Sequence, residues 1–159
     1  MSKEKIVSPQ DLESLCQSLH SKGAMIVFTN GVFDLLHPGH VQYLTEAGQL
    51  GTHLLVALNT DASTRKIKGD KHPLLELEAR MEVLAALEAV SLVTWFDEVT
   101  PADVIRLVRP DVLVKGGDWK TEEIVGKDFV ESYGGRVLSL PFQKHYSTTN
   151  IVDRILNLP

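Results

Sequence analysis

Residues 28–40 read F-T-N-G-V-F-D-L-L-H-P-G-H, and this stretch decides the predicted fold. It continues an apolar run, residues 24–28, which has the composition of a strand buried on both faces of a parallel sheet. A glycine-containing turn and a polar helix start follow. A strand, a turn and a helix in this order present backbone N–H groups to phosphate in α/β folds. Neither G-x-G-x-x-G nor G-x-x-x-x-G-K-[ST] occurs here, so the usual phosphate fingerprints do not apply.

Two histidines, His37 and His40, stand in this stretch with a proline and a glycine between them. Proline pushes the preceding residue toward extended backbone and suits the first position of a helix, so His37 is predicted as the N-cap. His40 then lies one turn inside the helix. Gly39 has no Cβ, so an anion can approach the N–H groups at this end. Two imidazole N–H donors at a positive helix end suit phosphate oxygens that gain charge during a displacement.

Two other interpretations of the histidine pair stay open from spacing alone. H-x-x-H can place two zinc ligands on one helical face, although no cysteine lies nearby and only Asp34 offers a third ligand. Alternatively, His37 only caps the helix and His40 is an incidental neighbour.

Composition predicts a single α/β domain over residues 1–159. Apolar residues make up 43% of the chain and charged residues 23%, as in ordinary globular proteins. A net charge of −5 gives no reason to expect nucleic acid as a partner. The single Cys16 excludes a disulfide within the chain and fits a reducing compartment. No apolar run is long enough for a membrane span and no signal-peptide core is present, so we expect a cytoplasmic protein without membrane contact.

Five short apolar runs alternate with helical patterns along the chain, which predicts a Rossmann-like, doubly wound five-stranded parallel sheet with helices on both faces. A capped helix from Ser8 to Gly23 precedes the first strand, so residues 1–23 are expected as an N-terminal helical extension packed on the domain. The predicted strands are residues 24–28, 53–58, 91–96, 111–115 and 136–140. The helical patterns cover residues 41–51, 76–90, 100–109, 122–133 (broken at Gly126) and the segment from Ser147 onward.

Each unusual polar segment follows one of these strands. The segments are residues 29–40, 59–71, 116–119 and 142–149. Ligands in such sheets bind beyond the carboxyl ends of the strands, so we expect the four segments to converge on one edge of the sheet. Residues 65–71 hold the only dense group of basic side chains, and we expect them to form a mobile loop.

The segment T-N-G-V-F-D-L-L-H-P-G-H, together with Ser147-Thr148-Thr149, resembles the cytidylyltransferase-like nucleotidyltransferase superfamily, whose marks are H-x-G-H and a late S-T/S-T helix start. Within it, four segments most resemble the D-glycero-β-D-manno-heptose 1-phosphate adenylyltransferases, which make ADP-heptose: N-T-D-A-S after the second strand, K-G-D near residue 68, T-P at 100–101 and L-V-K-G-G-D-W at 113–119. The resemblance covers the chain from about residue 6 onward.

The resemblance implies that a sugar 1-phosphate oxygen attacks the α-phosphorus of ATP in line and releases pyrophosphate. Positioning and charge stabilisation then supply most of the acceleration. His37 and His40 would contact the ATP phosphates and stabilise the transition state. Backbone at Thr29 and Asn30, with Gly39, would line the nucleotide cleft.

Three charged residues have implied roles at the phosphates. Lys68, beside Gly69, is expected to neutralise the reacting phosphates; a solvated surface position is the alternative. Asp34 is expected to hold a motif N–H or orient a histidine, and a plain turn cap is equally compatible. Arg80 matches an arginine that the superfamily carries and is expected to contact phosphate or the acceptor, with an ion pair to Glu76 as the alternative.

The base is expected near the fourth strand. Lys115 ends that strand and is favoured as a nucleotide-binding residue. Asp118 and Trp119 match positions that contact the base in relatives, so Trp119 is expected to stack on adenine. Ser147, Thr148 and Thr149 combine hydroxyl groups with helix N–H groups and are expected to form a second phosphate cradle that faces the first.

The chain departs from the family pattern near its C-terminus. Val152 stands where relatives often carry an arginine, and Phe142 stands where some cytidylyltransferases do, with Lys144 or His145 as possible substitutes. Mg²⁺ is expected to enter with ATP, held mainly by phosphates and water. No dedicated metal ligands are predicted, and a homodimer is expected from the resemblance.

Two alternative functions stay open. A cytidylyltransferase acting on CTP with glycerol 3-phosphate or a similar phosphate ester would use the same motif. A nucleotide-binding module without turnover would use the histidines only as anion donors.

Overall fold

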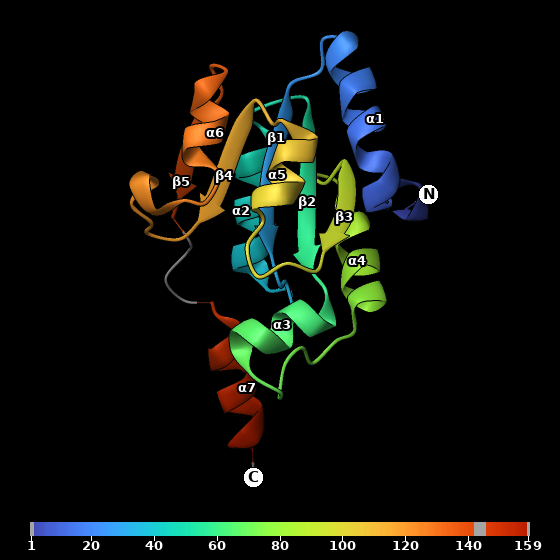
Figure 1. The fold of residues 1–159 in the computed structure, drawn as a ribbon. Coiled ribbons are helices and arrows are strands. Elements are labelled where there is room, and N and C mark those ends of the chain that lie inside the picture. Colours follow the sequence, from blue (N-terminus) through green and yellow to red (C-terminus); the bar gives the residue numbers. More distant parts are fainter. Residues whose placement is uncertain (1, 142–145, 159) are drawn as a thin grey trace.

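The computed structural model describes residues 2–141 and 146–158 (Figure 1). Its centre is a five-stranded sheet, all parallel, in the order β3-β2-β1-β4-β5. The strands are β1 (Ile26–Gly31), β2 (His53–Asn59), β3 (Leu92–Phe96), β4 (Val112–Gly116) and β5 (Arg136–Leu140). The chain runs outward from β1 in one direction and then returns to the other side, which confirms the doubly wound α/β fold. The switch point lies at β1, the strand that leads into the histidine motif.

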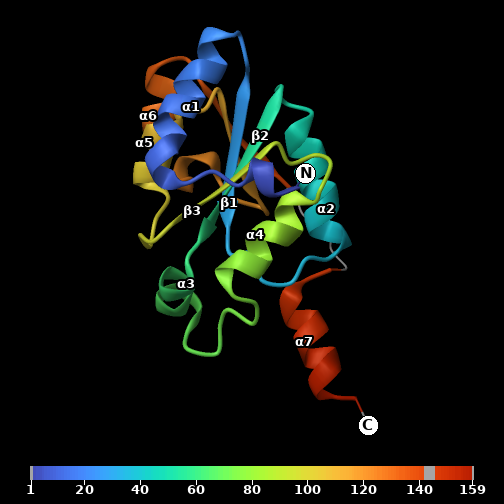
Figure 2. The ribbon, with the colours of Figure 1, turned by 90° about the vertical axis from the view of Figure 1, so that its right-hand side faces the viewer.

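Helices cover both faces of the sheet. The α-helices are α1 (Pro9–Ser21), α2 (Pro38–Gly48), α3 (Asp61–Lys68), α4 (Leu77–Ala85), α5 (Ala102–Val108), α6 (Lys127–Ser132) and α7 (Thr148–Leu156), with short 3-10 helices η1 (Ser2–Lys5) and η2 (Thr121–Glu123). Figure 2 shows α2 and α4 on one side of the sheet and α1, α5 and α6 on the other. Figure 1 shows α3 and α7 beyond the carboxyl ends of the strands. Among the described residues, no helix is long and apolar enough to cross a lipid bilayer.

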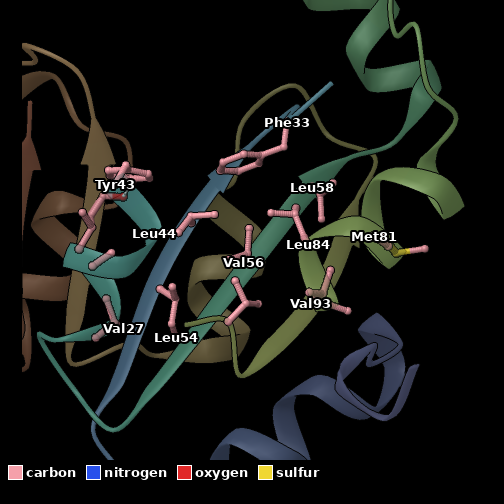
Figure 3. Packing of buried hydrophobic residues seen from close by; sticks show 14 of the residues in the cluster. Val27, Phe33, Tyr43, Leu44, Leu54, Val56, Leu58, Met81, Leu84 and Val93 are labelled. Carbon is pink, nitrogen blue, oxygen red and sulfur yellow. Dashed lines mark hydrogen bonds between the residues drawn. The ribbon is translucent and has the colours of Figure 1, made fainter. Parts of the chain in front are cut away.

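The two faces hold two apolar layers. Under α2 and α4, strand residues such as Val56 and Leu58 pack against Leu44 and Leu84 (Figure 3). On the opposite face, Leu12 and other buried residues of α1 pack with those of α5 and α6. The N-terminal helix therefore contributes to the core as well as covering it. Because both faces are buried, the central strands are nearly continuous apolar runs.

Some predicted boundaries are wrong. The first strand begins at Ile26 and ends at Gly31, because Met25 is exposed and the polar end of the strand still pairs with β2. The helix predicted over 76–90 ends at Ala85. The break at Gly126 is confirmed: its φ is +92°, and a Cβ there would lie 2.8 Å from Ile105 Cδ1.

The largest difference concerns the basic segment that follows β2. Helix α3 spans Asp61–Lys68, so residues 65–68 are helical where the sequence predicted a mobile loop over 65–71. Thr60 is its N-cap, and its Oγ1 accepts the N–H of Ser63 at 3.1 Å. The buried residues of α3 are Ser63 and Thr64, both polar, so the helix has no apolar stripe for a periodicity argument to detect.

Candidate active site

A cavity of about 560 Å³ lies at the switch point, beyond the carboxyl ends of β1, β2 and β4. Its volume lies within the range of small-molecule sites in proteins. Segments far apart in the sequence line it, including the end of β1, helix α3 and the loop before α5. Five predicted site residues are among its walls: Asn30, His40, Lys68, Lys115 and Trp119.

The histidine motif has the predicted local geometry. His37 is the N-cap of α2, with φ −138° and ψ 168°, and Pro38 occupies the first helical position. Its Nδ1 accepts the backbone N–H of His40 at 3.4 Å, so the neutral ring carries its proton on Nε2. The two imidazole rings are stacked, with centroids 3.8 Å apart and planes at 21°. His40 faces the cavity, whereas His37 lines an adjoining apolar groove with Tyr146.

Both histidines favour the neutral form. Burial, His37 and Lys68 together lower the pKa of His40 to about 4. Burial also lowers the pKa of His37. At neutral pH each ring therefore offers one N–H donor without a full charge, and stacking at this distance brings no repulsion between two cations.

Gly39 makes room for this stack. A Cβ at Gly39 would lie 3.1 Å from the His37 ring and 3.5 Å from Tyr146 Cβ. The prediction assigned this space to an approaching anion, but the His37 ring lies beside it. The glycine is therefore needed for the position of the histidine.

Phe33 is a wall residue that the sequence analysis missed. It has φ +48°, a left-handed conformation that is uncommon outside glycine. Its ring centroid lies 5.3 Å from that of His40, and a Cβ on Gly31 would meet the Phe33 ring at 2.9 Å. The turn after β1 thus places an aromatic wall against the catalytic candidate.

Two lysines line the cavity from different sides of β1. Lys68 ends α3, which follows β2, and Lys115 lies in β4. Burial lowers the pKa of Lys115. Its Nζ lies 5.8 Å from the Trp119 ring centroid, a cation–π distance. The indole is held by its Nε1–H, which donates to Gly116 O at 3.1 Å.

Thr29 and Asp34 lie outside the cavity lining. Thr29 is fully buried, with its hydroxyl 2.6 Å from Tyr43 Oη. Asp34 accepts the N–H groups of Leu74 and Leu75 at 2.8–2.9 Å, and His72 Nδ1 lies 3.2 Å from its Oδ2. Burial alone would raise the pKa of Asp34, but these hydrogen bonds and His72 hold it below its ordinary value. Asp34 therefore anchors the segment before α4 instead of the motif helix or its histidines.

Arg80 is also placed away from the cavity. Its side chain is buried and donates to three backbone carbonyls and to Asp61. The predicted contact with phosphate or acceptor finds no support in this placement, and the alternative ion pair with Glu76 is wrong. The reason is that α4 packs its arginine inward, beneath the segments that follow β1 and β2.

The predicted second phosphate cradle, residues 147–149, contacts the histidine segment but does not line the cavity. Ser147 caps α7 by accepting the N–H of Asn150 at 3.0 Å, and Thr148 Oγ1 donates to Leu35 O at 3.3 Å. Thr149 and Asp118 are exposed and are not part of the cavity walls. The predicted substitutes Lys144 and His145, like Phe142, lie outside the described residues.

The loop before α5 completes the cavity. Val99, Thr100 and Pro101 line it, as do Tyr43 and Asn59. The rule that ligands bind beyond strand carboxyl ends would have identified residues 99–101, because they follow β3 just as the predicted segments follow their strands. The Thr100-Pro101 pair in this loop also belongs to the motifs on which the resemblance rests, although no site role was predicted for it.

The described residues contain no group of three or more His, Cys, Asp or Glu side chains that could hold a metal ion. The stacked histidine rings and the engaged Asp34 carboxylate do not fit the zinc alternative. A magnesium ion that enters with a nucleotide would instead take most of its ligands from phosphates and water.

Comparisons with known proteins identify relatives for this arrangement. A family model described as cytidylyltransferase-like matches residues 28–154. The bifunctional protein HldE of Marinomonas sp. (strain MWYL1) is 49% identical over 149 residues, which are 94% of this chain and 31% of that protein. HldE of Geobacter metallireducens is 50% identical over 152 residues, which are 96% of this chain and 31% of that protein. The chain thus spans about a third of the length of these curated relatives.

Solved structures also resemble the chain. The crystal structure of a lipopolysaccharide core biosynthesis protein from Thermoplasma volcanium GSS1 matches with a TM-score of 0.63 and 29% identity. The match covers 78% of this chain and 100% of that protein's chain. Pantoate-beta-alanine ligase from Francisella tularensis, complexed with beta-gamma ATP and beta-alanine, has a TM-score of 0.64 and 15% identity. That match covers 96% of this chain and 78% of the ligase and shows the fold alone.

Proposed function

This chain belongs to the cytidylyltransferase-like family and is a nucleotidyltransferase, and from that premise we propose that it transfers AMP from ATP to a heptose 1-phosphate. The products are ADP-heptose and pyrophosphate, for the synthesis of lipopolysaccharide core or a related surface glycan. The observation that carries the proposal is the stacked His37–His40 pair, with His40 facing a cavity that Lys68 also lines.

The donor groups suit in-line displacement at phosphorus. A phosphate oxygen of the sugar attacks the α-phosphorus, and the bond to the β,γ-pyrophosphate breaks with its electron pair on the leaving oxygen. The attacking oxygen is already an anion, so no general base is needed. Neutral imidazole N–H groups and the Lys68 ammonium stabilise the charge that gathers on the phosphates. Mg²⁺, bound with ATP, supplies further charge neutralisation when present.

The apolar walls of the cavity suit the nucleobase. Trp119 stands with its ring against the Lys115 ammonium, and Val125 and Pro101 line the same space. We propose that adenine stacks on the Trp119 indole, with Asn30 and Lys115 nearby. Asp118, Ser147 and Thr149 do not line this cavity, so the proposal assigns them no contact with the base.

The acceptor is proposed from the names of the relatives. HldE relatives at about 50% identity, a lipopolysaccharide core biosynthesis protein among similar structures, and the K-G-G-D-W segment support a heptose phosphate. Because the chain covers only about a third of HldE, the acceptor stays a proposal for this domain.

We further propose that the enzyme works as a homodimer, as the family resemblance implied. Light scattering compares the mass of the assembly with the 17.6 kDa of one chain.

The deciding experiment is a substrate panel. Pyrophosphate release is measured with Mg-ATP or Mg-CTP, each combined with D-glycero-β-D-manno-heptose 1-phosphate, glucose 1-phosphate and glycerol 3-phosphate. We expect the highest kcat/KM for ATP with the heptose phosphate. A preference for CTP with glycerol 3-phosphate would instead support the cytidylyltransferase alternative. Nucleotide binding without release for any pair would indicate a binding module.

A further inference from the structure

Helix α3 carries Lys68 at its last residue and has little apolar anchoring. Its buried residues are Ser63 and Thr64, and Ile67 is 46% exposed. Polar contacts near the first turn hold the helix instead. Ser63 Oγ donates to Glu98 O at 2.7 Å and accepts from Asn59 Nδ2 at 3.0 Å. The position of Lys68 therefore depends on how firmly the N-terminal end of α3 is held.

The guanidinium of Arg80 is the buried centre of that anchorage. Its Nη2 donates to Asp61 Oδ1 at 2.7 Å and to Asn59 O at 3.0 Å, at the start of α3 and the end of β2. Its Nη1 donates to Val32 O at 2.7 Å, in the turn that precedes the histidine motif. Its Nε donates to Leu75 O at 2.9 Å, just before α4. One planar group thus joins the chain after β1, the chain after β2 and the segment before α4.

We propose that Arg80 is a positioning residue: through Asp61 and Val32 it holds helix α3 against the histidine segment, so that Lys68 faces His40 across the cavity. The arginine does not touch the substrate. The forked geometry of four directed N–H groups cannot be reproduced by lysine, which presents a single point charge. The catalytic consequence rests on the proposed function, whereas the structural claim does not.

His40 provides a readout that needs no substrate. The titratable or charged groups around it are His37 on its own helix, Lys68 on α3 and Lys115 in β4. Lys68 contributes to the low pKa of His40, after burial and His37. If α3 loosens and the ammonium withdraws, the pKa of His40 rises. NMR of the histidine rings in the ligand-free protein measures this titration directly.

The variants are Arg80→Lys, which keeps the charge, and Asp61→Asn, which keeps the size of the partner. Lys68→Met shows the shift expected when the ammonium is removed. We expect Arg80→Lys and Asp61→Asn to raise the pKa of His40 in the same direction. Loss of the Asp61 charge alone would lower it, because a nearby anion favours protonated histidine. The sign of the shift in Asp61→Asn therefore separates repositioning from simple charge removal.

Asp103→Asn is the matched control, since Asp103 is also in the first turn of a helix and paired with an arginine, Arg106, but at an exposed site. It should leave the His40 titration unchanged. Should Arg80→Lys fail to fold, Asp61→Asn still tests the claim, because the Asp61 side chain is 29% exposed and its loss creates no cavity. An unchanged or lower pKa of His40 in folded Asp61→Asn overturns the proposal.

Kinetics add a second arm. Lys68→Met and Arg80→Lys should each lower kcat, and Arg80→Lys should cause no further loss in the Lys68→Met background, because the two act through one ammonium. Independent, multiplying losses would contradict positioning. Weaker ATP binding in Arg80→Lys with an unchanged His40 titration would indicate direct phosphate contact. If no variant or wild type shows turnover, the proposed function fails, but the NMR arm still decides the role of Arg80.

Discussion

The rings of His37 and His40 stack with 3.8 Å between their centroids, and the Nδ1 of His37 accepts the backbone N–H of His40. The hydrogen bond to His37 Nδ1 serves two purposes. It caps helix α2, and it fixes the tautomer that leaves Nε2–H of His37 as a donor. The capping interpretation and the catalytic interpretation of this motif are compatible, because different nitrogen atoms of the same ring are involved.

The first prediction concerns Gly39. Gly39→Ala should displace the His37 ring, because the new Cβ would lie 3.1 Å from it. We expect kcat to fall by about tenfold or more through the loss of donor alignment. The free energy of unfolding should change little, since alanine favours the helix by up to about 1 kcal/mol. Thr45→Ala, at an exposed position of α2, is the control. Full activity in Gly39→Ala would show that the ring position is not required.

The second prediction concerns acid stability. The pKa of His40 is lowered to about 4 in the folded chain, whereas in the unfolded chain it returns to about 6.5. As pH falls below about 6.5, the unfolded chain takes up a proton that the folded chain refuses, so stability decreases until the pH reaches about 4. Urea unfolding of wild type and His40→Gln between pH 7 and 4.5 measures this. His53→Gln, at the start of β2, is the control. Parallel pH profiles for wild type and His40→Gln would contradict the shift.

The third prediction concerns Asp34. Asp34→Asn places an amide where Leu74 and Leu75 donate, so the free energy of unfolding should fall by about 2 kcal/mol. The lowered pKa of Asp34 means that its contribution is present above its ordinary pKa and is lost as pH falls through the lowered value. Wild type should therefore approach the variant in stability at strongly acidic pH. Asp70→Asn, on the exposed neighbouring segment, should match wild type at every pH.

The fourth prediction concerns the base. Trp119→Ala should raise KM for ATP about tenfold while kcat changes less, because base stacking contributes to binding. In a Trp95→Phe background Trp119 is the remaining tryptophan, so ATP should change its fluorescence. Trp95→Phe itself should keep the wild-type KM. A fluorescence signal that does not respond to ATP would place the base elsewhere.

The fold could be predicted because the strands are continuous apolar runs of the kind that only a doubly covered sheet buries. Val56 and Leu55, neighbours in β2, point to opposite core layers and are both fully buried. Helix α3 could not be predicted this way, because its inward face is made of Ser63 and Thr64. Its N-cap, Thr60, and the acidic Asp61 in its first turn are the local signs of a helix start.

The site was predictable where local rules act and not where tertiary contacts decide. His37 before Pro38 specifies an N-cap from backbone sterics alone, and the structure has it there. Asp34 and Arg80 are different, because most of their partners are backbone groups, up to 48 residues away in the sequence. A charged residue in a motif looks the same in sequence whether it meets a substrate or a buried carbonyl. The loop at residues 99–101 needed only the strand-end rule to be applied to β3 as well.

The most direct measurement is pyrophosphate release from Mg-ATP and D-glycero-β-D-manno-heptose 1-phosphate by wild type, His40→Ala and the control His53→Ala. Loss of one transition-state donor should lower kcat of His40→Ala on the order of 100-fold or more, with the fold intact by circular dichroism and with His53→Ala unaffected. A folded His40→Ala enzyme that keeps the wild-type kcat would contradict the role assigned to the histidine pair.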